Sequence, residues 1–548
     1  MRQSRVRKVE SRAPMRVNLR TSSAFLLLLA AGLTTGACTC GKSTGAKTQA
    51  LAELLPANAD TVVMLPDLAV LGLKLAQVQK LKLAGFVAQL QGFSTGEEAV
   101  NALVANAGVD FRSSESMKEA GLAPERGLGV ARFADGSGYA VVGVSSEEKL
   151  LKLLQNLART RLGATQKSTH AENGLTVVTF ARPGEAVGEI AAVVVGKYGL
   201  LATKVSAAAL RRYATLTLPE SVAGSGALSS ALKRLPPNPD VYVQQPQGGP
   251  LGADLKPLTV AVQLTREGLV VTADLPGATG AGMDVLKPEP GPQLLPLLPG
   301  DAVLLARSGS DLRRLAPYWR SMMRPSVTAM FERAGLDVEQ DLLGNLKPGA
   351  VMGVSLAPTV SLASGVPTSL DMRRTNPLGW IHLVGIGEVR DASRLKPLLG
   401  KLEAAGPKLG MTLTPSERKG HDVLLSTYSQ GEGASFAAVK DRVVIAAPVR
   451  RLEDALERLD GKGTASTLEP ALKEALTANG VAVVVDLVKL STAVRKLPSE
   501  AWGVGGFAMK ATATRWLEAT DDLKALVVTA RSTPESLQAQ LTLRLVLP

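Results

Sequence analysis

The chain contains few of the residues that cross-link small folds or carry out chemistry. Only two of its 548 residues are cysteines, Cys38 and Cys40, and aromatic residues make up 3% of it. Because both cysteines lie near the N-terminus, no disulfide can join distant parts of the body, which must be held by hydrophobic cores. The three histidines, His170, His382 and His421, lack the spacing of a preformed zinc site. We therefore expect no metal and no cofactor.

A strong excess of one charge is also missing once the N-terminus is set aside. The formal net charge is +13 at pH 7, but residues 1–37 hold seven basic residues and one acidic residue, which leaves +7 on the rest. The remaining basic residues are scattered singly, without the interleaved aromatic residues on which bases stack. We therefore expect no nucleic-acid partner.

Residues 1–37 have the layout of an export signal. Basic residues precede an uncharged run, Ala24–Leu33, and small residues then lead to Cys38. A membrane-spanning helix needs roughly 20 apolar residues, about twice the length of this run. We expect residues 1–37 to be a lipoprotein signal peptide, with Met15 as an alternative start, and Cys38 to be the lipid anchor. A signal cut near Ala37 without acylation and an uncleaved anchor are the alternatives.

The same region matches a second motif. Gly36–Ser43 fits the phosphate-loop pattern G-x-x-x-x-G-K-[ST], in which backbone N–H groups between a strand and a helix bind phosphates. Here the preceding strand would be the apolar export run, and cleavage before Cys38 would remove the first glycine. We therefore reject a nucleotide site.

The body of the chain repeats itself with an offset of 243 residues. Leu54-Leu55-Pro56 matches Leu297-Leu298-Pro299, and the segment 197–202 matches 440–445. This period is far longer than a solenoid repeat, so it indicates two complete domains. The expected divisions are a flexible tether at 38–50, a first α+β domain at 51–283, a proline-rich semi-rigid linker at 284–296 and a second α+β domain at 297–548.

Both copies show the same order of hairpins and helices. In the first copy we expect strands at 127–133 and 139–144, joined by a tight turn at 135–138. A helix at 147–162 follows, with Ser145 or Ser146 as its N-cap. Because hairpins dominate, the expected fold class is α+β, with largely antiparallel sheets packed against helices in two homologous tandem domains.

The copies open on similar residues, Leu55-Pro56 followed by Ala59 and Leu298-Pro299 followed by Ala302. Together with the signal and the hairpin–helix pairs, this layout resembles an uncharacterised bacterial lipoprotein family of unknown function. The resemblance implies an acylated Cys38 in the bacterial cell envelope, lipid-anchored on the periplasmic side or at the outer membrane. It implies no active site.

The second copy carries two segments that the first copy lacks. One replaces the tight turn with residues 357–379, and the other follows the strand at Val481. Long loops are often functional or disordered, and tryptophan is favoured at binding surfaces. We expect these segments to form a partner-binding or membrane-facing edge; the alternative is that the tryptophans are core residues and the loops inert. The candidate contact residues are Arg373, Arg374, Trp380, Trp502, Phe507 and Trp516.

One fragment has an enzyme-like pattern. Ser230-Ala231-Leu232-Lys233 fits S-x-x-K, but Pro470 replaces the serine in the second copy. We expect a non-enzymatic, membrane-anchored envelope lipoprotein acting as a structural or interaction protein. It would contact the membrane through its acyl chains and bind an envelope protein partner. The alternative is a periplasmic carrier or binding protein for an apolar, lipid-like ligand.

Overall fold

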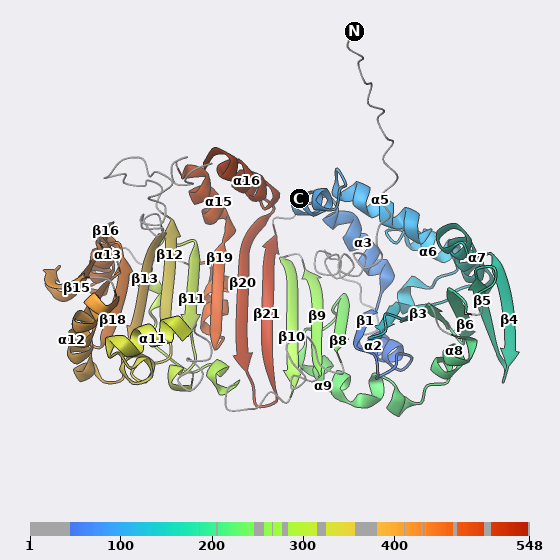
Figure 1. Ribbon diagram of the computed structural model, residues 1–548, viewed down its shortest axis with the longest axis horizontal. Coiled ribbons are helices and arrows are strands. Elements are labelled where there is room, and N and C mark those ends of the chain that lie inside the picture. The colour runs from blue at the N-terminus through green and yellow to red at the C-terminus, as the bar shows by residue number, and fades with distance from the viewer. Residues whose placement is uncertain are drawn as a thin grey trace, which may run out of the picture.

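The described strands of the protein form one large antiparallel sheet, seen from one face in Figure 1. The structure is a computed structural model. It describes residues 44–545 apart from 186, 204–205, 246–256, 266, 277–282, 315–324, 357–380, 410–411, 429–430, 433, 464–467 and 498–505. The antiparallel sheet with helices packed on it confirms the α+β class.

Ten strands lie in the part of the chain that we call the first half. They are β1 (Thr61–Leu65), β2 (Leu128–Arg132), β3 (Gly138–Gly143), β4 (Gln166–Glu172), β5 (Leu175–Ala181), β6 (Ile190–Val195), β7 (Tyr198–Thr203), β8 (Val241–Gln245), β9 (Leu258–Thr265) and β10 (Gly268–Pro276). Hydrogen bonding places them in the spatial order β4-β5-β6-β7-β3-β2-β1-β8-β9-β10.

The remaining strands form the second half. They are β11 (Leu304–Ser308), β12 (Ala350–Leu356), β13 (Ile381–Glu388), β14 (Thr412–Arg418), β15 (His421–Tyr428), β16 (Gly431–Glu432), β17 (Ser435–Val439), β18 (Arg442–Ala447), β19 (Val481–Asp486), β20 (Leu523–Ser532) and β21 (Ser536–Leu545). From the outer edge inward their order is β14-β15-β17-β18-β13-β12-β11-β19-β20-β21, with the short β16 beside β15.

The two halves meet where their last strands pair. β10 and β21 form an antiparallel ladder from Gly268 opposite Arg544 to Pro276 opposite Ser536, and Thr272 and Gln540 are its middle pair. This ladder makes the sheet continuous across the molecule (Figure 1). The division into two domains, expected from the sequence, therefore does not correspond to two separate sheets.

Helices cover both faces of this sheet. They are α2 (Thr44–Ala52), α3 (Leu68–Val78), α4 (Lys82–Leu90), α5 (Gly96–Ala107), α6 (Ser114–Glu119), α7 (Glu147–Leu157), α8 (Ala207–Ala214), α9 (Ala227–Arg234), α11 (Pro325–Ala334), α12 (Leu395–Ala405), α13 (Val449–Leu459), α14 (Pro470–Thr477), α15 (Leu487–Lys496) and α16 (Gly506–Ala519). A π-helical turn, Ala158–Leu162, continues α7.

Because side chains alternate along a strand, the sheet has two distinct faces. We call the side that carries Val271, Leu541 and Val528 the apolar face, and the other side the opposite face. On the apolar face, α6 and α7 pack over the outer strands of the first half, α11 and α12 over those of the second half, and α3 over β8, β9 and β10. On the opposite face, α2, α8 and α9 cover the core of the first half, and α13 and α14 that of the second.

Several local predictions from the sequence are confirmed. β2 and β3 pair across the turn, where the Asp135 carboxylate accepts a hydrogen bond of 2.8 Å from the backbone N–H of Ser137. Ser146 caps α7 by accepting from the N–H of Lys149. These features depend on neighbouring residues only, which is why the sequence revealed them.

One expected division needs correction. Residues 44–50 of the expected tether belong to α2, because Thr48 and Leu51 of this helix are fully buried in the core of the first half. The segment expected to be a semi-rigid linker, 284–296, packs against the second half. The N–H of Glu289 donates to the carbonyl of Gly309 at 2.8 Å, and Leu294 is buried in the core of the second half.

Candidate ligand-binding face

A row of aliphatic residues crosses the centre of the apolar face from strand to strand. Each member is the direct cross-strand partner of the next, so all of them point to the same side of the sheet. In spatial order from β8 to β18 the row consists of Val241, Val262, Val271, Leu541, Val528, Val483, Ala306, Met352, Gly385 and Ile445. With neighbouring strands about 4.8 Å apart, the row extends for about 40 Å.

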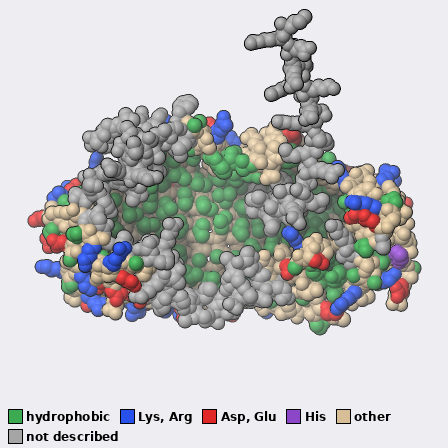
Figure 2. All heavy atoms as spheres, in the orientation of Figure 1, with side chains coloured by type: hydrophobic (Ala, Val, Ile, Leu, Met, Phe, Trp, Pro, Cys, Tyr) green, Lys and Arg blue, Asp and Glu red, His purple; other side chains and the backbone are tan. Residues whose placement is uncertain are grey.

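The neighbouring rows on the same face are also aliphatic at the centre of the sheet. On one side lie Ala273, Ala539 and Ala530, and on the other Leu269, Leu543, Leu526, Val485, Leu304, Val354 and Leu383. None of these side chains carries a charge or a hydrogen-bonding group. Figure 2 shows hydrophobic side chains gathered in a hollow over the central strands, between more polar ends of the molecule.

The centre of this face is only partly covered by the rest of the protein. Val130, Met352, Val528 and Leu541 all lie on it, and they are 37%, 39%, 40% and 38% exposed. Burying a whole Val or Leu side chain is worth about 1.5–3 kcal/mol, so covering what remains exposed would contribute about 1 kcal/mol for each. Soluble proteins rarely expose large contiguous apolar patches, and such patches mark sites that bind proteins, membranes or ligands.

Helix α3 borders this face and is fixed to the sheet by a buried ion pair. Lys74 of α3 and Asp240, at the start of β8, are 7% and 8% exposed, and the Lys74 ammonium donates to the Asp240 carboxylate. The second oxygen of Asp240 accepts the N–H of Leu264 at 2.9 Å, and Lys74 also donates to the Leu264 carbonyl at 3.3 Å. The helix N-terminus is capped by Asp67. The position of α3 over the sheet is thus specified by polar contacts as well as by packing.

Helices α4 and α16 meet across the junction of the two halves. The rings of Phe86 and Trp516 pack with their centroids 4.3 Å apart and tilted by 56°. Asp521, just after α16, accepts hydrogen bonds from Lys82 of α4 at 3.1 Å and from Arg495 of α15 at 2.7 Å. These ion pairs are solvent-exposed and individually weak. Together with the ring contact they connect helices of both halves above the sheet.

The residues expected to contact a partner are only partly described. Trp516 is 51% exposed on α16, so it is not a core residue, although one side of its ring packs on Phe86. Phe507 belongs to α16 by its backbone, and nothing is described of its side chain. Arg373, Arg374, Trp380, Trp502 and Cys38, the expected lipid anchor, lie outside the described residues, as does the phosphate-loop match.

Among the described residues, no cluster of three or more His, Cys, Asp or Glu side chains could hold a metal ion. His382 Nδ1 accepts from the Arg451 guanidinium at 3.0 Å; burial, and then the charge of Arg451, lower the pKa of His382. Ser230 and Lys233 of the S-x-x-K fragment both lie exposed on α9.

The apolar face was not predicted from the sequence. A signal was present in strands such as β19, whose residues Val481 to Val485 are apolar on both sides. That pattern is typical of a strand buried on both faces. In the assembled sheet, other elements cover one of the two sides only partly. The sequence of the strand alone does not indicate this.

Comparisons with protein-family models, curated proteins and solved structures gave no match. Of the described helices, none is both long and apolar enough to cross a bilayer.

Proposed function

We propose that the protein is a non-enzymatic envelope lipoprotein, attached to the membrane through Cys38, that binds the hydrocarbon chain of a lipid on its apolar face. The observation that carries this proposal is the aliphatic row from Val241 to Ile445 with its half-exposed members. A membrane-anchored protein would have hydrocarbon ligands close at hand, and acyl chains at Cys38 would supply that attachment.

The chemistry of the face favours a hydrocarbon over a protein partner. Protein interfaces are enriched in aromatic residues and arginine and carry directed hydrogen bonds. The central rows of this face contain neither, and their backbone groups are used within the sheet. A flexible methylene chain needs only apolar contact, worth about 0.8 kcal/mol for each buried CH₂. Small residues such as Ala273, Ala306 and Ala539 leave room for it to lie close to the backbone.

We also propose that the two halves are homologous tandem domains. The offset of 243 residues in the sequence and the equal strand order in both halves support this interpretation. In such a duplication the apolar face is a joint surface, since its central row takes members from both copies.

The second candidate function is the binding of an envelope protein partner. The half-exposed Trp516 on α16 favours it, because tryptophan is enriched at the energetic centres of interfaces. In this function the helices above the sheet, and not the aliphatic rows, would make the contact.

The proposal is tested by placing a charge on the apolar face. Val528→Glu and Leu541→Glu put a carboxylate at positions that are 40% and 38% exposed, so the fold should tolerate them. Binding is measured by the fluorescence of a long-chain polyene fatty acid. We expect at least about tenfold weaker binding, because even 1.4 kcal/mol of lost contact gives that factor.

The matched control is Leu218→Glu, a similar change at a side chain that is 56% exposed and lies on the turn after α8. It should leave the affinity unchanged. Equal affinities in all three variants and the wild type would refute binding on the apolar face. Native mass spectrometry of the purified wild type for co-purifying lipid provides an independent measurement.

A further inference from the structure

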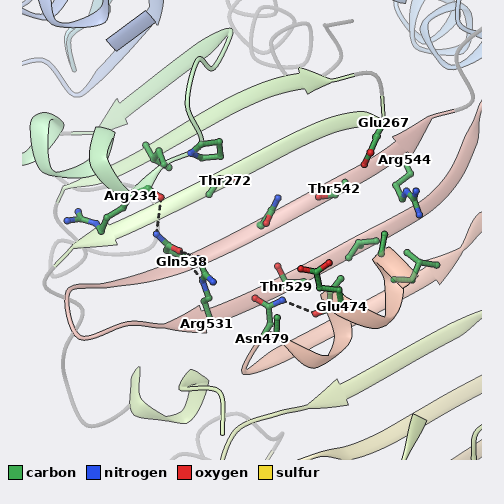
Figure 3. A pocket seen from close by; sticks show the side chains of 18 residues that line it. Arg234, Glu267, Thr272, Glu474, Asn479, Thr529, Arg531, Gln538, Thr542 and Arg544 are labelled. Carbon is green, nitrogen blue, oxygen red and sulfur yellow. Dashed lines mark hydrogen bonds between the residues drawn. The ribbon is translucent and has the colours of Figure 1, made fainter. Parts of the chain in front are cut away.

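A separate cavity lies on the opposite face, directly over the junction of the two halves. It has a volume of about 440 Å³ and opens between α9 of the first half and α14 of the second (Figure 3). Its floor is formed by β10, β21 and β20 around the central Thr272–Gln540 pair. The volume lies within the range of about 300–1,000 Å³ that is usual for small-molecule sites.

The floor of this cavity carries five uncharged polar side chains, beside the apolar Val527 and the charged Arg531 and Arg544. Thr272, Thr529, Thr542, Gln538 and Gln540 all line it, so hydroxyl and amide groups of three adjacent strands point into one space. Thr272 is 7% exposed, and its hydroxyl has no hydrogen-bond partner among the described residues. A buried hydroxyl without a partner is unfavourable, and buried polar groups are usually hydrogen-bonded to protein groups or ordered water, so a polar ligand could satisfy this one.

Two of the three arginines that line the cavity, Arg234 and Arg544, are paired with carboxylates, and Glu267 and Glu474 line it as well. Arg234 donates to both oxygens of the buried Asp274, the shortest contact being 2.7 Å, and this hydrogen bonding raises the pKa of Arg234. Arg544 forms two bonds of 2.8 Å with Glu469. Because these pairs are internally compensated, they do not provide a net charge for recognising an ion.

Arg531 at the rim is held by an amide instead of a carboxylate. Two of its guanidinium nitrogens donate to Gln538 Oε1 at 3.1 and 3.0 Å. Gln538 in turn donates to the backbone carbonyl of Arg234 at 3.3 Å, so both halves of the chain contribute to this network (Figure 3). The network fixes the orientation of the polar groups before any ligand arrives.

The walls of the cavity are largely apolar, although Glu474 and Asn479 also line it on the α14 side. Leu235 and Pro236 follow α9 on one side, and Leu472, Ala475 and Ala478 belong to or follow α14 on the other. A ligand that fits should therefore present hydrogen-bonding groups to the floor and C–H surface to the walls. Because Arg531, Glu267 and Glu474 give the lining charges of both signs, it does not select for a ligand with one strong charge.

We propose that this cavity binds a neutral saccharide. Sugar hydroxyls both donate and accept, which matches the threonine and glutamine groups of the floor, and the C–H edges of a sugar ring match the walls. The site is independent of the proposed lipid surface, because the sheet separates the two. The protein would then hold a hydrocarbon on one face and a sugar on the other.

The experiment uses isothermal titration calorimetry of the wild-type protein with maltose, cellobiose and N,N′-diacetylchitobiose, and with inorganic phosphate as a charged probe. At least one of the disaccharides is expected to bind, and phosphate is not. Thr272→Val keeps the side-chain shape and removes the hydroxyl without a partner. Gln540→Leu removes the central amide at an exposed position. Each should weaken disaccharide binding by about tenfold without lowering the melting temperature.

The control is Thr169→Val, the same replacement on the exposed edge strand β4, which should leave sugar binding unchanged. Absence of binding by all three disaccharides, binding of phosphate in their place, or equal sugar affinity in all variants would each overturn the saccharide assignment. Val528→Glu should leave sugar binding intact while fatty-acid binding is lost. The two proposals can therefore fail separately.

Discussion

The ion pair between Lys74 and Asp240 should be essential for keeping α3 on the sheet. Replacing Lys74 by Met removes the ammonium and leaves the Asp240 carboxylate 8% exposed, with the Leu264 N–H as its remaining hydrogen-bond donor among those described. Breaking a buried pair from one side costs about 3–5 kcal/mol, since the remaining charge is uncompensated. Native domains are stable by only about 5–15 kcal/mol, so this is a large fraction of the total.

The best assay is hydrogen exchange measured by mass spectrometry, because a chain of this length need not unfold in a single step. In Lys74→Met we expect the amides of α3 to lose protection corresponding to about 3–5 kcal/mol. The double variant Lys74→Met, Asp240→Leu should recover most of it, because two apolar side chains can replace a buried pair at little net cost. Lys80→Met, at an exposed lysine just after the same helix, is the control and should stay within about 0.5 kcal/mol of the wild type.

The reasoning would be refuted if Lys74→Met lost less than about 1 kcal/mol, or if the double variant were less stable than the single one. The same variant also connects stability to the proposed function. Loss of α3 would expose Val262 and Leu264 beneath it, so binding of an apolar dye should increase in Lys74→Met and return to the wild-type level in the double variant.

Two further predictions concern single sites. Gly72→Ala in α3 should destabilise by about 1–3 kcal/mol, because the new Cβ would lie 2.0 Å from the Phe111 carbonyl oxygen. Gly85→Ala in α4, where nothing lies within 4 Å, should instead stabilise by up to about 1 kcal/mol, and equal shifts in thermal unfolding would contradict this. The lowered pKa of His382 means that the fold favours the neutral ring. The contribution of His382 to the free energy of unfolding is therefore complete above its unfolded pKa of 6.5 and is lost as the pH falls below that value. Between about pH 7.5 and pH 5.5 the wild type should therefore lose more stability than His382→Gln, and identical losses would show that His382 does not contribute.

Part of the fold could be predicted because it is determined locally. The β2–β3 hairpin needs only the turn at Asp135 and the alternation on either side, and α7 needs only Ser146 and its leucine spacing. Predictions failed where tertiary packing overrides composition. Residues 44–50 look like a polar tether, yet burial of Thr48 and Leu51 makes them part of a helix.

Some elements gave weak signals for physical reasons. Strand β4 is exposed along its whole length, so its residues lack the apolar alternation that reveals a half-buried strand. Helix α15 follows β19 directly, and Asp486 ends the strand and caps the helix at the same time. The sequence analysis recognised the strand and missed the helix that begins at the next residue.

The candidate sites were less predictable than the elements that form them. The apolar row joins residues such as Val241 and Ile445, which are far apart in the chain and belong to different halves. Trp516, selected from the sequence, does lie exposed on α16. The rows and the cavity were not anticipated, because each depends on strand order and not on any one motif.

The sequence by itself determined the absence of stapling disulfides in the body and the local hairpins and helices. Only the tertiary structure decided that β10 pairs with β21, bringing Thr272 beside Gln540 and joining two sets of strands into one sheet. The reason is that the alternation of side chains along a strand shows which of its residues share a face of the sheet. It does not show which strand pairs with this one or whether a helix covers that face. The open apolar face and the polar cavity behind it both arise from that one pairing.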